Sequence, residues 1–96
     1  MANKHIVPVD QLCEHYNIET SFIHSLMDYG LTEIMIVEET SYIQVNKIKD
    51  LEKMIRMHYD LEINMEGIEA ISHLLDRVDS LQEELKTLKN RLRFYE

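Results

Sequence analysis

Residues that could bind a metal ion are too few and too dispersed in this 96-residue chain to form a site. Cys13 is the only cysteine, and His15 follows it by two positions, so on a helix the two side chains point to different faces. Glu69 and His73 stand four positions apart and share a helix face. Two ligands do not complete a metal site, so the sequence predicts none.

Nucleophilic and phosphate-binding patterns are equally incomplete. Ser21, His24 and Ser25 lie close together, yet no acidic residue is placed to orient the histidine as a catalytic triad requires. The chain has only two glycines, and they stand far apart, so no glycine-rich phosphate loop is present. We therefore expect a protein that is not an enzyme and that uses no cofactor.

The first elements predicted from the sequence are two short helices. Pro8 suits the first turn of a helix, and the apolar residues Val9, Leu12, Cys13 and Tyr16 recur along one face, with Asn17 as a plausible cap. A second helix begins at Thr20 or Ser21, either of which can bond a free backbone N–H, and ends at Gly30. Its apolar face is formed by Phe22, Ile23, Leu26 and Tyr29. The short connection predicts a helix-turn-helix.

Two β-prone runs follow, Ile34 to Val37 and Tyr42 to Val45, separated by the polar residues 38–41. They predict a hairpin with a four-residue break, which lacks the Asn-Gly signal of a tight turn. A third helix is expected from about Asn46. Its buried stripe would consist of Ile48, Leu51, Ile55 and His58 or Tyr59, with Met54 beside it.

The last third of the chain has a coiled-coil pattern. Asn64 is a good cap for a helix over residues 65–96, which would be about 48 Å long. Apolar residues alternate steps of three and four along it: Ile71, Leu74, Val78, Leu81, Leu85, Leu88, Leu92 and Tyr95. Folding back on its own domain would cover only the first turns of this seam. We therefore predict a homodimer through the seam, with a winged domain over residues 1–63 and a dimerisation helix over 64–96. The sequence leaves open whether the two helices of the coiled coil run parallel or antiparallel.

The charge is acidic and uneven. Eighteen acids against ten bases give −8, with histidine neutral; residues 1–66 hold 12 acids and 5 bases, hence −7, and residues 67–96 hold 6 and 5, hence −1. Proteins that bind duplex DNA neutralise phosphates with Lys and Arg, and the second helix has neither. The acidic excess fits either an ordinary solvated surface or a docking face.

The single cysteine, the lack of a visible signal peptide and the lack of a long apolar run predict a cytoplasmic protein without membrane contact. The order of helix-turn-helix, hairpin, third helix and long last helix resembles the MerR-type winged helix. More specifically, the chain is similar to the CbpM-type chaperone modulators. The similarity is carried by Leu12-Cys13-Glu14-His15-Tyr16, by Phe22 to Leu26 before Tyr29-Gly30-Leu31, and by Asp60 to Asn64 with Gly67-Ile68 beyond.

This resemblance implies a mainly α fold: a MerR-like winged helix-turn-helix with a small hairpin wing and a long C-terminal coiled-coil helix. It also implies a partner, because such modulators bind the J-domain of a DnaJ-like co-chaperone, CbpA, and hinder its action. The resemblance assigns no contact residues. By charge and expected exposure, the candidates in this sequence are the acids Asp28, Glu33, Glu38 and Glu39, with Tyr29 and Tyr42 as aromatic anchors.

Two other functions remain open at this point. A MerR-like DNA-binding transcriptional regulator needs cations on the second helix and on the hairpin. This sequence supplies them only later, at Lys47, Lys49, Lys53 and Arg56, so we do not expect direct DNA binding. A small-ligand sensor would instead need a pocket between the wing and the coil.

Overall fold

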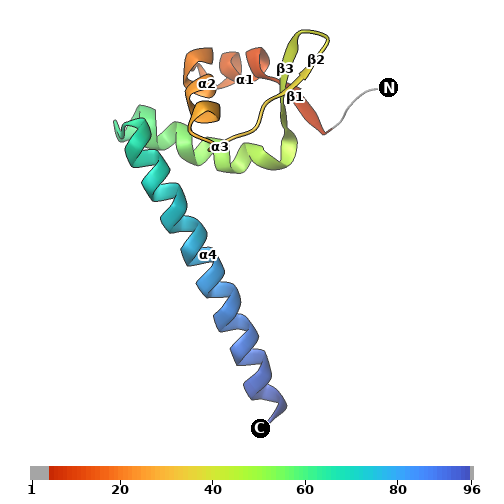
Figure 1. Ribbon diagram of the computed structural model, residues 1–96, viewed down its shortest axis with the longest axis vertical. Helices are drawn as coiled ribbons and strands as arrows, with labels where there is room; N and C mark the ends of the chain where they lie inside the picture. Colours follow the sequence, from red (N-terminus) through yellow and green to blue (C-terminus); the bar gives the residue numbers. More distant parts are fainter. Residues whose placement is uncertain (1–4, 96) are drawn as a thin grey trace.

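The computed structural model describes residues 5–95 and consists of a small winged domain from which one long helix projects (Figure 1). In chain order the elements are β1 (Ile6–Pro8), α1 (Val9–Tyr16), α2 (Thr20–Asp28), β2 (Met35–Val37), β3 (Thr40–Gln44), the 3-10 turn η1 (Val45–Lys47), α3 (Ile48–Ile55), the π-helical turn η2 (Arg56–Asp60) and α4 (Met65–Phe94). The predicted fold class, a mainly helical MerR-like winged helix with a hairpin and a long last helix, is confirmed.

The helix-turn-helix forms as expected and its helices end where predicted, but the starts of both helices differ from the prediction. Asn17 ends α1 in the left-handed conformation, at φ 56°, and Gly30 follows α2 at φ 73°. Pro8 lies in β1 and precedes α1 instead of forming its first turn. The cap of α2 is Glu19, whose side chain makes no capping bond, so the prediction of Thr20 or Ser21 was wrong by one residue. The buried residues of the two helices are Val9, Leu12, Cys13, Phe22, Ile23 and Leu26.

The wing is a three-stranded antiparallel sheet in the order β1-β3-β2. The β2–β3 connection has two residues, Glu38 and Glu39, not the four predicted. Both have positive φ, 50° and 66°, as in the type I′ turn that matches the twist of a hairpin. Sequence reasoning missed this turn because glutamate, unlike Asn or Gly, is sterically disfavoured in that conformation.

The Glu38–Glu39 turn stores backbone strain that can be released. We expect the double substitution Glu38→Asn and Glu39→Gly to stabilise the protein by about 1 kcal/mol, because Asn-Gly adopts a type I′ turn at lower cost. Urea unfolding followed by circular dichroism would measure the change. The matched control, Glu38→Gln and Glu39→Gln, removes both charges and keeps the strained backbone. If the control stabilised the protein as much as Asn-Gly, charge repulsion and not backbone conformation would be the cause.

The third helix region is less regular than its apolar pattern indicated. η2 inserts a wider π-type turn, in which the Leu61 N–H donates to the Arg56 carbonyl at 3.1 Å. Leu51, Met54 and Met57 are buried there. Ile48 and Ile55 pack against the core from partly exposed positions. Of the predicted stripe, Tyr59 is 41% exposed, whereas the ring of His58 stacks on Phe22 with centroids 4.7 Å apart.

α4 begins as predicted and then leaves the domain. The side chain of Asn64 accepts a hydrogen bond of 2.8 Å from the Gly67 N–H and so caps the helix. Ile68 is fully buried, and Ile71 packs against the core from a partly exposed position. The first turns of α4 thus pack against the winged domain, and the domain boundary at residue 64 stays a prediction. The predicted helix end at Glu96 lies outside the described residues, among which no helix is both long and apolar enough to cross a bilayer.

Candidate partner-binding surface

The exposed side of α2 is where a DNA-binding winged helix would meet phosphates, and it carries no cation. The sequence from His5 to Asn46 has seven acids and neither Lys nor Arg. A cavity of about 210 Å³ lies between α2 and the hairpin, and its charged or titratable lining residues are Asp10, His24 and Glu39. A phosphate placed there would face the carboxylates of Asp10 and Glu39.

The structure separates the six predicted contact residues into two groups. Asp28, Tyr29 and Glu33 lie at and after the end of α2, whereas Glu38, Glu39 and Tyr42 belong to the hairpin. Figure 1 shows the end of α2 beside the start of α4, with the hairpin projecting on the other side of the domain. The four acids are exposed and the two tyrosines are half-buried. The two groups therefore offer separate surfaces, not one continuous face.

Tyr29 has an internal partner that the sequence did not indicate. Its hydroxyl donates a hydrogen bond of 2.7 Å to Glu66 Oε2, linking the end of α2 to the first turn of α4. The hydrogen bond from Tyr29 lowers the pKa of the Glu66 carboxyl, and the same bond raises the pKa of the Tyr29 hydroxyl.

The substitution Tyr29→Phe is expected to return the pKa of Glu66 upward toward the ordinary glutamate value. In the wild type, Glu66 stabilises the fold above its unfolded-state pKa, and that contribution is lost as pH falls through the lowered folded-state pKa. The protonated hydroxyl of Tyr29 stabilises the fold at pH values below the ordinary tyrosine pKa. This stabilisation is lost as pH rises through the raised folded-state pKa of Tyr29. Carbon-detected NMR titration of the Glu66 carboxyl would measure the shift.

A second tyrosine–glutamate bond provides the control for this titration. Tyr16 donates to Glu52 Oε2 at 2.6 Å, between α1 and α3. The substitution Tyr16→Phe removes a bond of the same kind elsewhere and should leave the Glu66 titration unchanged. A Glu66 pKa that stayed low in Tyr29→Phe would show that another group sets it.

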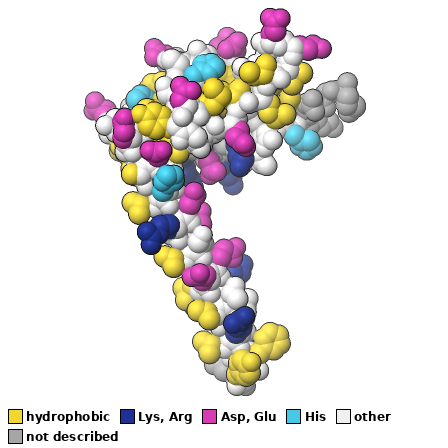
Figure 2. Space-filling model, viewed as in Figure 1, with side chains coloured by type: hydrophobic (Ala, Val, Ile, Leu, Met, Phe, Trp, Pro, Cys, Tyr) yellow, Lys and Arg dark blue, Asp and Glu magenta, His cyan; other side chains and the backbone are white. Residues whose placement is uncertain are grey.

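The predicted coiled-coil seam lies on the free part of α4. Ile71 packs against the winged domain, and the other seven seam residues are exposed, from Val78 at 46% to Tyr95 at 88%. Figure 2 shows hydrophobic side chains spaced along the length of the projecting helix. Long exposed apolar stripes of this kind often mark interaction sites, and the role of the seam as a dimer interface stays a prediction.

The whole chain is similar to known regulatory and chaperone-modulating proteins. The model of the MerR HTH family of regulatory proteins matches residues 7–90. The chaperone modulatory protein CbpM of Coxiella burnetii (strain Dugway 5J108-111) is 30% identical over 82 residues, covering 84% of this chain and 77% of that protein. The chain belongs to the CbpM-type, MerR-like family. The CbpM of Pseudomonas entomophila (strain L48) is 24% identical over 95 residues, which are 96% of this chain and 94% of that protein.

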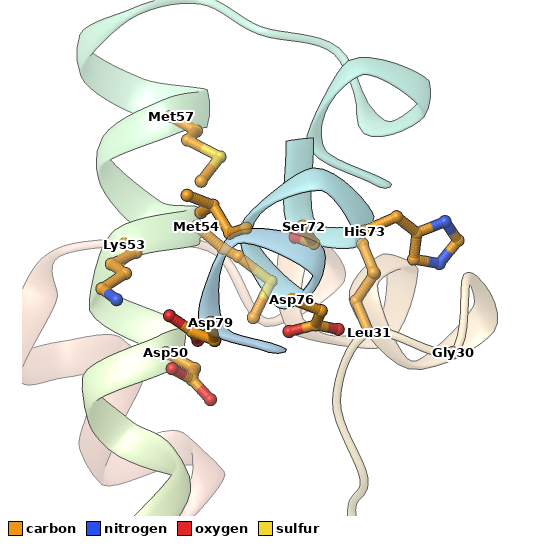
Figure 3. Close-up of a pocket in the computed structure, with 11 residues that line it drawn as sticks. Gly30, Leu31, Asp50, Lys53, Met54, Met57, Ser72, His73, Asp76 and Asp79 are labelled. Atoms are coloured by element: carbon orange, nitrogen blue, oxygen red, sulfur yellow. The ribbon is translucent and has the colours of Figure 1, made fainter. Parts of the chain in front are cut away.

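A groove of about 250 Å³ lies where α4 leaves the domain of this CbpM-type chain (Figure 3). Asp50 and Lys53 of α3 and Asp76 and Asp79 of α4 line it, together with apolar residues that include Met54. It lies between α3 and α4, and its lining includes no residue of the hairpin, so it differs from the wing–coil pocket that a ligand sensor was expected to use. Within residues 5–95, no three His, Cys, Asp or Glu side chains are grouped to hold a metal ion.

Cys13, the one thiol of the chain, is buried in the core. Burial, and secondly the nearby Asp10 charge, raise the pKa of the Cys13 thiol. A neutral buried thiol is a poor nucleophile and metal ligand, so Cys13 acts as a small apolar core residue. The thiol-based metal sensing of some MerR-type proteins has no counterpart at this position.

Proposed function

We propose that this protein is a non-enzymatic chaperone modulator that binds the J-domain of a DnaJ/CbpA-like co-chaperone in the cytoplasm and inhibits its activity. The printed names of its relatives support a chaperone-modulating role. The observation that carries the proposal is the charge of the winged domain: a surface without cations over β1, α1, α2 and the hairpin, with seven acids. A J-domain presents a basic helix to its Hsp70 partner, so an acidic competitor is electrostatically complementary to it.

The active form in this proposal is a homodimer. Pairing of α4 with its copy covers the exposed seam from Leu74 to Tyr95 and leaves both winged domains accessible. Two J-domains could then be held by one dimer. Inhibition would be steric, because the bound modulator occupies the J-domain surface that its Hsp70 needs.

The rival function, transcriptional regulation through direct DNA binding, has one observation in its favour. The matching family is described as regulatory, and exposed cations do occur at Lys47, Lys49, Lys53 and Arg56. They lie on η1, α3 and η2 instead of on α2 or the hairpin. A regulator of this kind would have to contact DNA through a surface other than its helix-turn-helix.

Calorimetric titration with the J-domain encoded by the same genome tests the proposal. We expect a complex whose affinity falls by about tenfold between roughly 0.05 and 0.5 M salt, because screening weakens the attraction between opposite charges. A gel shift with duplex DNA serves as the comparison and should show no band. Absence of a J-domain complex would exclude the proposal, and tight DNA binding that falls steeply with salt would establish the rival.

A further inference from the structure

The pairing register of the wing sorts its side chains onto two faces. Successive residues of a strand point to opposite sides, and residues directly opposite in an antiparallel pair point to the same side. Ile43 is fully buried, so its face of β3 is the core face. Tyr42 lies on the other face, and its partners are Met35 in β2 and Pro8 in β1.

The outer face of this sheet is apolar where a solvated sheet face is normally polar. It consists of Ile6, Pro8, Met35, Val37 and Tyr42, with Gln44 and Thr40 as its polar members. None of the five apolar residues packs against the core cluster, in contrast to Val7 and Ile34 of the same segments. Met35 and Val37 are 39% and 44% exposed. Among residues 5–95, the outer face of the wing is therefore an apolar patch that does not pack against the core cluster.

Carboxylates lie at one end of this patch, and the three described strands of the sheet contain no Lys or Arg. The hairpin turn consists of Glu38 and Glu39, and no Lys or Arg occurs between residues 5 and 46. Figure 2 shows the hydrophobic side chains along the hairpin with acidic groups at its end. An apolar patch with an acidic end fits a partner that presents an apolar side chain next to cations.

We propose that the outer face of the wing is the docking surface for the J-domain, and that it receives an apolar side chain flanked by Lys or Arg on a basic helix. This inference rests on the proposed function and adds where on this chain the J-domain binds. A second copy of this chain does not fit the same surface, because two wings brought together would place Glu38 and Glu39 near the same glutamates of the other copy, and like charges repel. Figure 1 shows α4, which carries the coil seam, starting on the side of the domain away from the hairpin and running away from it, so pairing along α4 would leave the wing free.

The test is a J-domain titration of the double variant Met35→Gln and Val37→Thr. Both replacements keep side chains of similar size and remove only apolar contact. We expect the dissociation constant to rise at least about tenfold, the effect of losing one buried hot-spot contact. The control variant, Met27→Gln with Leu61→Thr, removes two exposed apolar side chains outside the sheet and should bind within about twofold of wild type.

The possible outcomes distinguish failure of this inference from failure of the proposed function. If wild-type protein does not bind the J-domain, the proposed function fails. If wild type, control and wing variant all bind equally, the function stands and the docking surface is wrong. A charge-reversed variant, Glu38→Lys with Glu39→Lys, should lower the association rate about tenfold at low salt; an unchanged rate would remove these carboxylates from the encounter.

Chemical-shift mapping keeps the inference testable even if the wing variant folds poorly. Amide resonances of the labelled wild-type protein are followed as unlabelled J-domain is added. We expect the largest changes in β1, β2 and β3. Changes confined to α3 and α4, around the groove lined by Asp50 and Asp76, would overturn the proposal and place the J-domain in that groove instead.

Discussion

Replacing Leu85 with Asp is expected to convert the proposed homodimer into a monomer. Leu85 lies at the middle of the exposed seam, at 52% exposure in the single chain, and dimer pairing would bury it. A carboxylate at that position would have to leave water without a cationic partner, at a cost of several kcal/mol in each chain. Light scattering coupled to size-exclusion chromatography would measure the mass. The winged domain should keep its circular dichroism signal, because its core does not involve Leu85.

The control for this prediction is Thr87→Asp. It adds the same charge two positions along α4, outside the seam, on a residue that is also exposed in the single chain. The control should remain a dimer. If Leu85→Asp also remained a dimer at micromolar concentration, the copies would associate through another surface and the seam would not be the interface.

The substitution Ile68→Ala is expected to destabilise the winged domain by about 2–5 kcal/mol. Ile68 is the one buried residue of α4 among those described, and it joins the start of this helix to the core cluster. Truncation removes apolar contact and leaves a cavity against side chains that cannot close it fully. In a domain whose total stability is about 5–15 kcal/mol, this loss is large.

Urea unfolding in the Leu85→Asp background would measure the effect, since a monomer unfolds independently of protein concentration. Leu74→Ala is the matched control: it truncates an apolar residue of the same helix that is 59% exposed in the single chain, and it should cost less than about 1 kcal/mol. If Ile68→Ala lowered the free energy of unfolding by less than about 1 kcal/mol, the packing of Ile68 against the core would not be what stabilises the start of α4.

The helices were predictable because their signals are local. The apolar residues at steps of three and four define α1, α2 and α4, and Asn64 and Gly30 mark boundaries through backbone chemistry that needs no tertiary contact. The π-helical turn η2 was not predictable in this way. Its residue His58 stacks on Phe22, from a helix more than thirty residues earlier, and no local pattern of the sequence indicates that contact.

The features of the candidate binding surface were also predictable only in part. The sequence by itself determined the charge, because the acids from Asp10 to Glu39 and the lack of cations there do not depend on how the chain folds. It also determined the heptad seam. Only the tertiary structure decided that Tyr29 is bonded to Glu66, and that Met35 and Val37 share an outer face with Tyr42. The physical reason is that a continuous apolar run such as Ile34–Val37 has no period of two, so its faces are assigned by the register of strand pairing.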